Sequence, residues 1–139
     1  MAITVPVVNT EIGVSAFGAP VANLLNALTE PTWVNLSLVS PWVNFGGSNP
    51  ACAYAVAGRF VMLRGTAKTT VALSGGATPV LYTPAAITPT GNLNTVGASQ
   101  VGPVGCAVVT STAVIQITVP SSGFAVNTWM SFDGMFYIR

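Results

Sequence analysis

Alternating apolar and polar positions dominate the chain after residue 32 and predict β-strands. Residues 32–38 read TWVNLSL and residues 113–119 read AVIQITV, and in both segments the alternate positions are apolar. This period of two is that of a half-buried strand. Short strand-like runs separated by turn residues also occur at 42–45, 52–57, 60–63, 80–82, 104–110, 128–132 and 135–138. The pattern predicts an all-β fold, either a β-sandwich or a jelly-roll-like barrel.

One segment, residues 58–65 (GRFVMLRG), places four apolar residues between two arginines and two glycines. Such a run is typical of a strand that is buried on both faces. Residues 57–59 predict a tight turn into it. If the strand continues past Gly65, Arg64 and Lys68 share one face and Arg59 lies on the other. The three cations are therefore not one anion site, and solvated charges, or one pair with Asp133, are the favoured interpretation.

Two further segments carry strong turn signals. Residues 74–105 are rich in Gly, Pro, Thr and Asn, and we expect them to be mostly loop, with a short strand at 80–82. A loop of that length usually carries function or packs on a neighbour. Asp133-Gly134 stands between two apolar runs, which predicts a β-hairpin.

The N-terminal part has a different pattern. Residues 1–14 predict an extended arm, in which Pro6 removes one ladder donor. The arm lies either on a neighbouring chain or on its own domain. Residues 19–28 predict one short helix with a single apolar stripe, which is a candidate assembly interface. The stripe consists of Val21, Leu24, Leu25 and Leu28. We therefore divide the chain into 1–31, for anchoring and trimerisation, and a β-domain at 32–139.

Charge is scarce, at 5% of residues with a net charge of +1. A soluble domain usually has about 25% charged residues, and low net charge gives little protection against self-association. We expect much of the surface to be covered in a permanent assembly, although a free monomer with a hydroxyl-rich surface is the alternative. Four basic residues are too few for a nucleic-acid partner. The sequence shows neither a membrane-spanning run nor a signal peptide, so synthesis in the cytoplasm is expected.

The side chains needed for most catalysis and metal binding are missing. The chain has no histidine, which excludes Ser-His-Asp and Cys-His mechanisms. Its acids, Glu11, Glu30 and Asp133, lie in segments not expected to meet, as paired-carboxylate hydrolysis would require. The two cysteines, Cys52 and Cys106, are predicted to be buried free thiols rather than a disulfide. We expect no enzyme activity, no cofactor and no metal site.

Aromatic residues offer one ligand chemistry. Trp33, Trp42, Trp129 and Tyr54 could stack on sugar rings. In a small sandwich, however, aromatic side chains are more often part of the core or of an interface. No individual ligand contact follows from the sequence.

Three segments taken in order resemble a known family. Residues 33–46 (WVNLSLVSPWVNFG), 58–65 (GRFVMLRG) and 129–137 (WMSFDGMFY) are similar to the C-terminal tip domain of bacteriophage tail fibres and minor tail proteins. Residues 17–23 (FGAPVAN) are similar to the connector that precedes such domains. The resemblance implies a homotrimeric β-sandwich in a virion that attaches to a host surface without catalysis.

The chain departs from that family at several points. Ser40-Pro41 stands where the family usually has Asn-Gly, Phe132 stands where it has Leu, and no shaft segment is expected upstream. Two hypotheses follow. The chain is a tail-fibre or tail-tip protein that binds a host surface glycan, or it is a capsid decoration (cement) protein that stabilises the head shell. Both place a homotrimer on the virion, in contact with other virion proteins and without membrane insertion.

Overall fold

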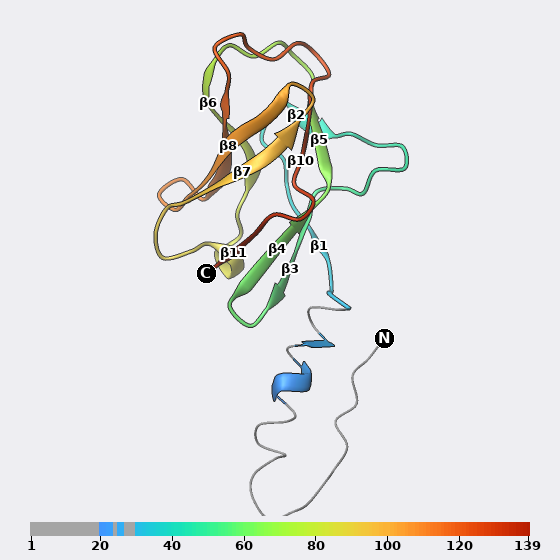
Figure 1. Cartoon of the computed structure of the whole chain (residues 1–139), viewed down its shortest axis with the longest axis vertical. Helices are drawn as coiled ribbons and strands as arrows, with labels where there is room; N and C mark the ends of the chain where they lie inside the picture. Colours follow the sequence, from blue (N-terminus) through green and yellow to red (C-terminus); the bar gives the residue numbers. More distant parts are fainter. Residues whose placement is uncertain (1–19, 24, 27–29) are drawn as a thin grey trace, which may run out of the picture.

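The structure, a computed structural model, describes residues 20–23, 25–26 and 30–139 (Figure 1). The arm at 1–14 lies outside the described residues. The remainder is almost entirely β-structure, which confirms the all-β prediction. The strands are β1 (Val34–Asn35), β2 (Trp42–Asn44), β3 (Ala53–Ala57), β4 (Phe60–Arg64), β5 (Thr66–Thr69), β6 (Gly76–Tyr82), β7 (Leu93–Ser99), β8 (Gly102–Val109), β9 (Val114–Val119), β10 (Trp129–Ser131) and β11 (Phe136–Ile138), with a 3-10 turn η1 (Ala85–Ile87).

The strands form two antiparallel sheets. One has four strands in the order β1-β3-β4-β11, and the other has seven in the order β2-β5-β10-β7-β8-β9-β6. In Figure 1 the β3–β4 hairpin extends from one end of the larger sheet. Apolar side chains from both sheets form one core, which includes Val61, Ile115 and Phe132. The Tyr137 hydroxyl donates to the Ile87 carbonyl at 2.9 Å and ties η1 to β11.

The seven-stranded sheet is almost closed into a barrel. Residues 37–39 bond to β6, where the Val39 amide donates to the Val80 carbonyl and the Tyr82 amide donates to the Ser37 carbonyl, both at 2.9 Å. After a turn at residues 40–41, β2 pairs with β5 on the opposite side of the sheet. One continuous stretch of chain therefore contacts both ends of the sheet. Of the predicted strand at 32–38, only β1 and a single bridge at Leu38 are formed.

Two of the crossovers between the sheets, from β4 to β5 and from β10 to β11, occur at motifs that carried the family resemblance. Gly65, with φ +107°, separates β4 in the small sheet from β5 in the large sheet. Asp133-Gly134 separates β10 in the large sheet from β11 in the small sheet, so the hairpin prediction is wrong there. The hairpin signal is local, whereas each flanking strand pairs with a strand distant in sequence. The prediction of a tight turn at residues 57–59 is confirmed by the β3–β4 pairing.

The central strand also differs from its prediction. In β4, Val61 and Leu63 are buried, but Phe60 is 38% exposed, so only one face is covered. Because β4 ends before Gly65, Arg64 and Lys68 lie on different strands. The continuous strand on which they were expected to share a face is not formed. The Arg64 guanidinium lies 4.4 Å from the centre of the Trp33 ring, and Lys68 Nζ lies 5.4 Å from that of Phe45.

The expectation of loop over residues 74–105 is wrong. This region contains β6, β7 and the start of β8, which form part of the large sheet. β7 (LNTVGAS) is rich in small and polar residues and has few of the bulky side chains that normally signal a strand, whereas most of β8 (GPVGCAVV) lies in the strand predicted at 104–110. They are held by continuous pairing from Leu93↔Val108 to Ser99↔Gly102, so tertiary pairing decides their conformation. Within residues 74–105, the one long loop is at residues 83–92 and includes η1.

The helix predicted at 19–28 is described in part. Residues 20–23 and 25–26 are helical. Val21 is 56% exposed and Leu25 is 40% exposed, so these two members of the apolar stripe are partly exposed. Leu24 and Leu28 lie outside the described residues. The assignment of the stripe to trimerisation and the division at residue 31 stay predictions.

Candidate ligand-binding surface

A cleft of about 430 Å³ lies on the outer face of the large sheet, where β2, β5 and β10 are neighbours. Antiparallel partners share a face, which places Ser131 beside Thr66 and Trp129 beside Lys68. Phe45 continues the first row, since its amide donates to the Thr66 carbonyl at 2.8 Å. We call this site the Trp129 cleft; it is lined by Phe45, Asn49, Thr66, Trp129, Ser131 and Asp133.

Asp133 is held rigidly at the rim of the Trp129 cleft. One carboxylate oxygen accepts a hydrogen bond from the Gly65 amide at 2.8 Å, and the other accepts from the Ser131 hydroxyl at 2.9 Å. The same hydroxyl accepts from the Asp133 amide at 3.2 Å. The Phe132 amide donates to the Gly65 carbonyl at 2.9 Å. Asp133 therefore joins the two crossovers while its side chain also faces the cleft.

The cleft combines two kinds of contact. Trp129 and Phe45 supply partly exposed aromatic rings, and Asn49 and Asp133 supply exposed hydrogen-bonding groups. Aromatic rings stack on apolar faces, while an amide and a carboxylate bind hydroxyl groups. A volume of a few hundred Å³ with few polar groups is typical of a small-molecule site. The arrangement fits a ligand with apolar faces and hydroxyl edges, as in a saccharide.

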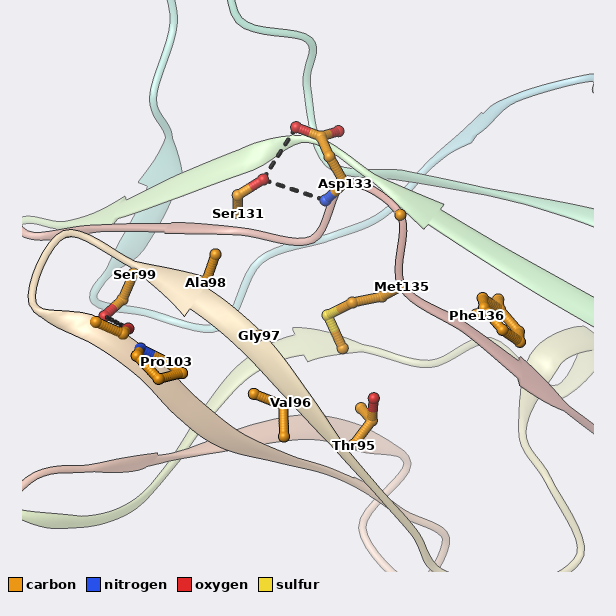
Figure 2. A pocket seen from close by; sticks show the side chains of 12 residues that line it. Thr95, Val96, Gly97, Ala98, Ser99, Pro103, Ser131, Asp133, Met135 and Phe136 are labelled. Carbon is orange, nitrogen blue, oxygen red and sulfur yellow. Dashed lines mark hydrogen bonds between the residues drawn. The ribbon is translucent and has the colours of Figure 1, made fainter.

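A second hollow lies on the other side of Ser131 and Asp133 (Figure 2). We call it the β7–β11 hollow, because β7 forms one wall and the chain from Ser131 to Phe136 forms the other. Its volume is about 630 Å³. In Figure 2 the Met135 side chain reaches toward Gly97 between the two walls. Side-chain hydroxyls of Ser99 and Ser131 lie at one end of this hollow, and the exposed ring of Phe136 lies at the other.

Four aromatic residues were candidates for sugar stacking, and the structure places them in different environments. Trp42 is 3% exposed and packs edge-to-face on Phe124 at 6.4 Å, so the core interpretation holds for it. Trp33 covers Arg64, and Tyr54 packs against the core. Only Trp129 lines the cleft. Phe45, Asn49 and Asp133 were not assigned to a ligand site from sequence, because their convergence depends on the pairing of β2, β5 and β10.

The described residues hold no cluster of three or more His, Cys, Asp or Glu side chains suited to a metal ion. Cys52 and Cys106 are both buried free thiols, as predicted. Burial, and to a smaller extent the nearby Asp133 charge, raises the pKa of Cys52 to about 12. Burial raises the pKa of Cys106 to about 11. In the described part of the chain, no helix is both long and apolar enough to cross a membrane.

Comparison with known proteins identifies the fold. No family model and no curated protein matches this sequence. Among solved structures, the chain is similar to the receptor-binding protein gp15 of Listeria phage PSA, with a TM-score of 0.57 and 18% identity over 96% of this chain and 82% of that one. It is also similar to the receptor-binding head domain of lactococcal phage bIL170, with a TM-score of 0.58 and 15% identity over 78% of this chain and 98% of that one.

At these identities the likeness defines the fold, which this chain shares with phage receptor-binding domains. The all-β fold that the sequence resemblance implied is therefore confirmed. The narrower resemblance to tail-fibre tip domains stays a prediction.

Proposed function

We propose that this chain is a non-enzymatic host-attachment protein of a bacteriophage virion, which binds a glycan of the host surface. The observation that carries the proposal is the Trp129 cleft, found on a fold shared with two phage receptor-binding proteins. Trp129 and Phe45 stack on the apolar faces of the sugar. Asn49 and Asp133 bind its hydroxyl groups.

The protein acts as a homotrimer assembled with other virion proteins in the host cytoplasm. Scarce charge and the exposed apolar residues Val21 and Leu25 support self-association. A trimer presents three clefts together, and multivalent attachment raises the strength of binding to a surface without new contacts. Light scattering of the full chain at micromolar concentration tests the trimer, and a monomer mass contradicts it.

Glycan binding is tested with the full chain on arrays of bacterial surface polysaccharides. Trp129→Ala is expected to weaken binding about tenfold, since loss of one stacking contact removes about 1.4 kcal/mol. Tyr82→Ala is the matched control, because Tyr82 is an aromatic residue, 50% exposed, that lies on β6 outside the Trp129 cleft. The glycan proposal fails if no polysaccharide binds, or if both variants lose binding equally.

The capsid decoration hypothesis predicts a different place in the virion. Immunogold labelling of intact virions with an antibody to this chain separates the two hypotheses. Label confined to the tail end supports host attachment. Label spread over the head contradicts it and makes this chain a cement protein.

A further inference from the structure

Strand β11 is an open edge of the small sheet. The Leu63 amide donates to the Met135 carbonyl at 2.8 Å, and the Arg139 amide donates to the Arg59 carbonyl at 3.0 Å. The backbone N–H and C=O groups of the odd-numbered residues in this segment therefore point toward β4. Because antiparallel strands alternate, the N–H and C=O groups of Phe136 and Ile138 point away from β4. These groups are available to a further strand.

The open edge borders the β7–β11 hollow. β10 pairs with β7 only through Met130↔Ser99 and Ser131↔Ala98, because the chain then crosses to the small sheet. Residues 95–97 of β7 therefore form the far wall of the hollow, opposite Met135 and Phe136 (Figure 2). The hollow is a space of about 630 Å³ beside an open strand edge, where an extended peptide segment could pair with that edge.

The residues around this edge are apolar and exposed. Phe136 is 67% exposed, Val96 is 64% exposed and Ile138 is 52% exposed. Natural proteins normally protect such an edge with charges, prolines, bulges or a covering segment. β11 itself (Phe-Tyr-Ile) contains none of the first three devices. A covering segment of matching apolar chemistry is the remaining device.

We propose that the N-terminal residues 3–8 of a second copy of this chain add to β11 as a further strand in the β7–β11 hollow. The segment reads ITVPVV, so Ile3, Val5 and Val7 share one face in an extended conformation. Val5 and Val7 have the two-residue spacing of Phe136 and Ile138 and bond to them. Pro6, which has no N–H, then turns away from β11, as a proline in an edge strand must.

The length of the chain permits this exchange. Nineteen residues precede the first described residue, Pro20. Fully extended they span about 60 Å, whereas a domain of this size has a radius of gyration of about 14 Å. The helical residues that follow leave Val21 and Leu25 partly exposed. The N-terminal segment is thus long enough to reach the β11 edge of a neighbouring copy.

This inference deepens the self-association within the proposed function by naming one donor segment and one acceptor edge. Chemical cross-linking between full-length chains tests it. One chain carries Val5→Cys and a second carries Ile138→Cys, and a short bis-maleimide joins thiols that lie close together. The native thiols are buried and the unmodified chain serves as the blank. Val126→Cys is the matched control acceptor, since Val126 is also 52% exposed but precedes β10.

The expected result is an interchain product several-fold more abundant for Val5→Cys with Ile138→Cys than for Val5→Cys with Val126→Cys. Equal yields overturn the proposal. So does a doubly substituted chain, Val5→Cys with Ile138→Cys, that cross-links only within itself. Thermal melts of each cysteine variant check that it is folded before the comparison is made.

A second readout needs no substitution. In the assembled protein the amides of Phe136 and Ile138 are expected to exchange slowly with deuterium, as amides of a paired strand do. Fast exchange in a sample that light scattering shows to be a trimer overturns the proposal. A trimer that binds glycan but gives no selective cross-link refutes only this inference. Selective cross-linking without glycan binding refutes only the attachment proposal.

Discussion

The two sheets expose different chemistry. The large sheet carries Thr66, Trp129 and Ser131 on adjacent strands, and they line the partly polar Trp129 cleft. The small sheet carries an outer apolar row made of Phe60, Met62, Phe136 and Ile138, paired across β4 and β11. The first surface offers hydrogen bonds and two aromatic rings, whereas the second offers almost only apolar contact.

The difference separates two kinds of recognition within one small domain. A site with convergent polar groups suits a hydroxyl-rich ligand, and an apolar row at an open strand edge suits another polypeptide. The two surfaces meet at Asp133, which lines both the Trp129 cleft and the β7–β11 hollow. Substitutions at that meeting point should affect both sheets, and substitutions farther away should affect only one.

The largest effect is expected from Gly65→Ala, which disrupts the junction of the sheets. An added Cβ would lie 2.5 Å from the Cys52 Cα and 2.6 Å from the Ala51 carbonyl carbon, with φ at +107°. We expect about 3 kcal/mol of lost stability in urea unfolding. Gly46→Ala is the control, since Gly46 has a positive φ but no atom within 4 Å, and should cost about 1 kcal/mol. Equal losses would show that contact at the junction is unimportant.

Alkaline pH should destabilise the fold next most strongly. The folded chain holds the Cys52 proton more tightly than the unfolded chain, because the pKa of Cys52 is raised from 9.0 to about 12. Stability from this group is complete below pH 9 and declines as the pH rises toward 12. By pH 11 the loss from Cys52 is about 2–3 kcal/mol.

Cysteine variants divide this pH effect between the sheets. Cys52 precedes β3 of the small sheet, and Cys106 lies in β8 of the large sheet, with a pKa raised to about 11. In urea titrations between pH 8 and 11, Cys52→Ala should flatten the pH dependence more than Cys106→Ala does. The reverse order would contradict the assignment of the stronger burial effect to Cys52.

Asp133→Asn should have a moderate effect. The substitution weakens the charge-assisted bond to the Gly65 amide and alters the one to Ser131, so we expect a loss of about 1 kcal/mol. Glycan binding should also fall, because the same carboxylate faces the Trp129 cleft. Ser131→Ala leaves the bond to Gly65 in place and should cost less stability. An Asp133→Asn variant as stable as the original would show that the crossovers do not need this link.

The smallest effect on stability, within about 0.5 kcal/mol, is expected for Phe136→Ser, because Phe136 is exposed. Trp129→Ala should cost about 1 kcal/mol, because Trp129 is partly buried. Their functional effects should differ. Phe136→Ser should lower the assembled mass in light scattering and leave glycan binding per chain intact, while Trp129→Ala should do the opposite. If either variant changes both properties, the two surfaces are not independent.

The fold class could be predicted from sequence because alternation is visible in segments such as β9, where Ile115, Ile117 and Val119 are buried. The β3–β4 hairpin was also predictable, since its turn joins strands that pair with each other. β7 was not, because its Gly, Ser and Thr positions become strand only when both neighbours are in place, whereas most of β8 lies in the strand predicted at 104–110. The crossovers at Gly65 and Asp133 likewise depend on pairing with distant strands.

Less of the candidate site could be predicted. Trp129 was among the four aromatic candidates, but nothing in the sequence distinguished it from Trp42, which is buried in the core. Asp133 was noted as a turn residue and as a lone acid, yet its place beside Asn49 and Phe45 comes from three strands that are far apart in sequence. Composition predicted contact rather than catalysis, and this stays part of the proposal.

The stretch at residues 37–44 that spans both ends of the large sheet has a consequence for how copies can add to one another. A sheet closed in this way leaves few backbone groups free to propagate strand pairing. In a chain with so little charge, two sheets with open edges could each pair with strands of other copies, and the protein would then precipitate. With the barrel almost closed, edge growth is confined to the small sheet, which favours a particle of finite size over an endless fibre.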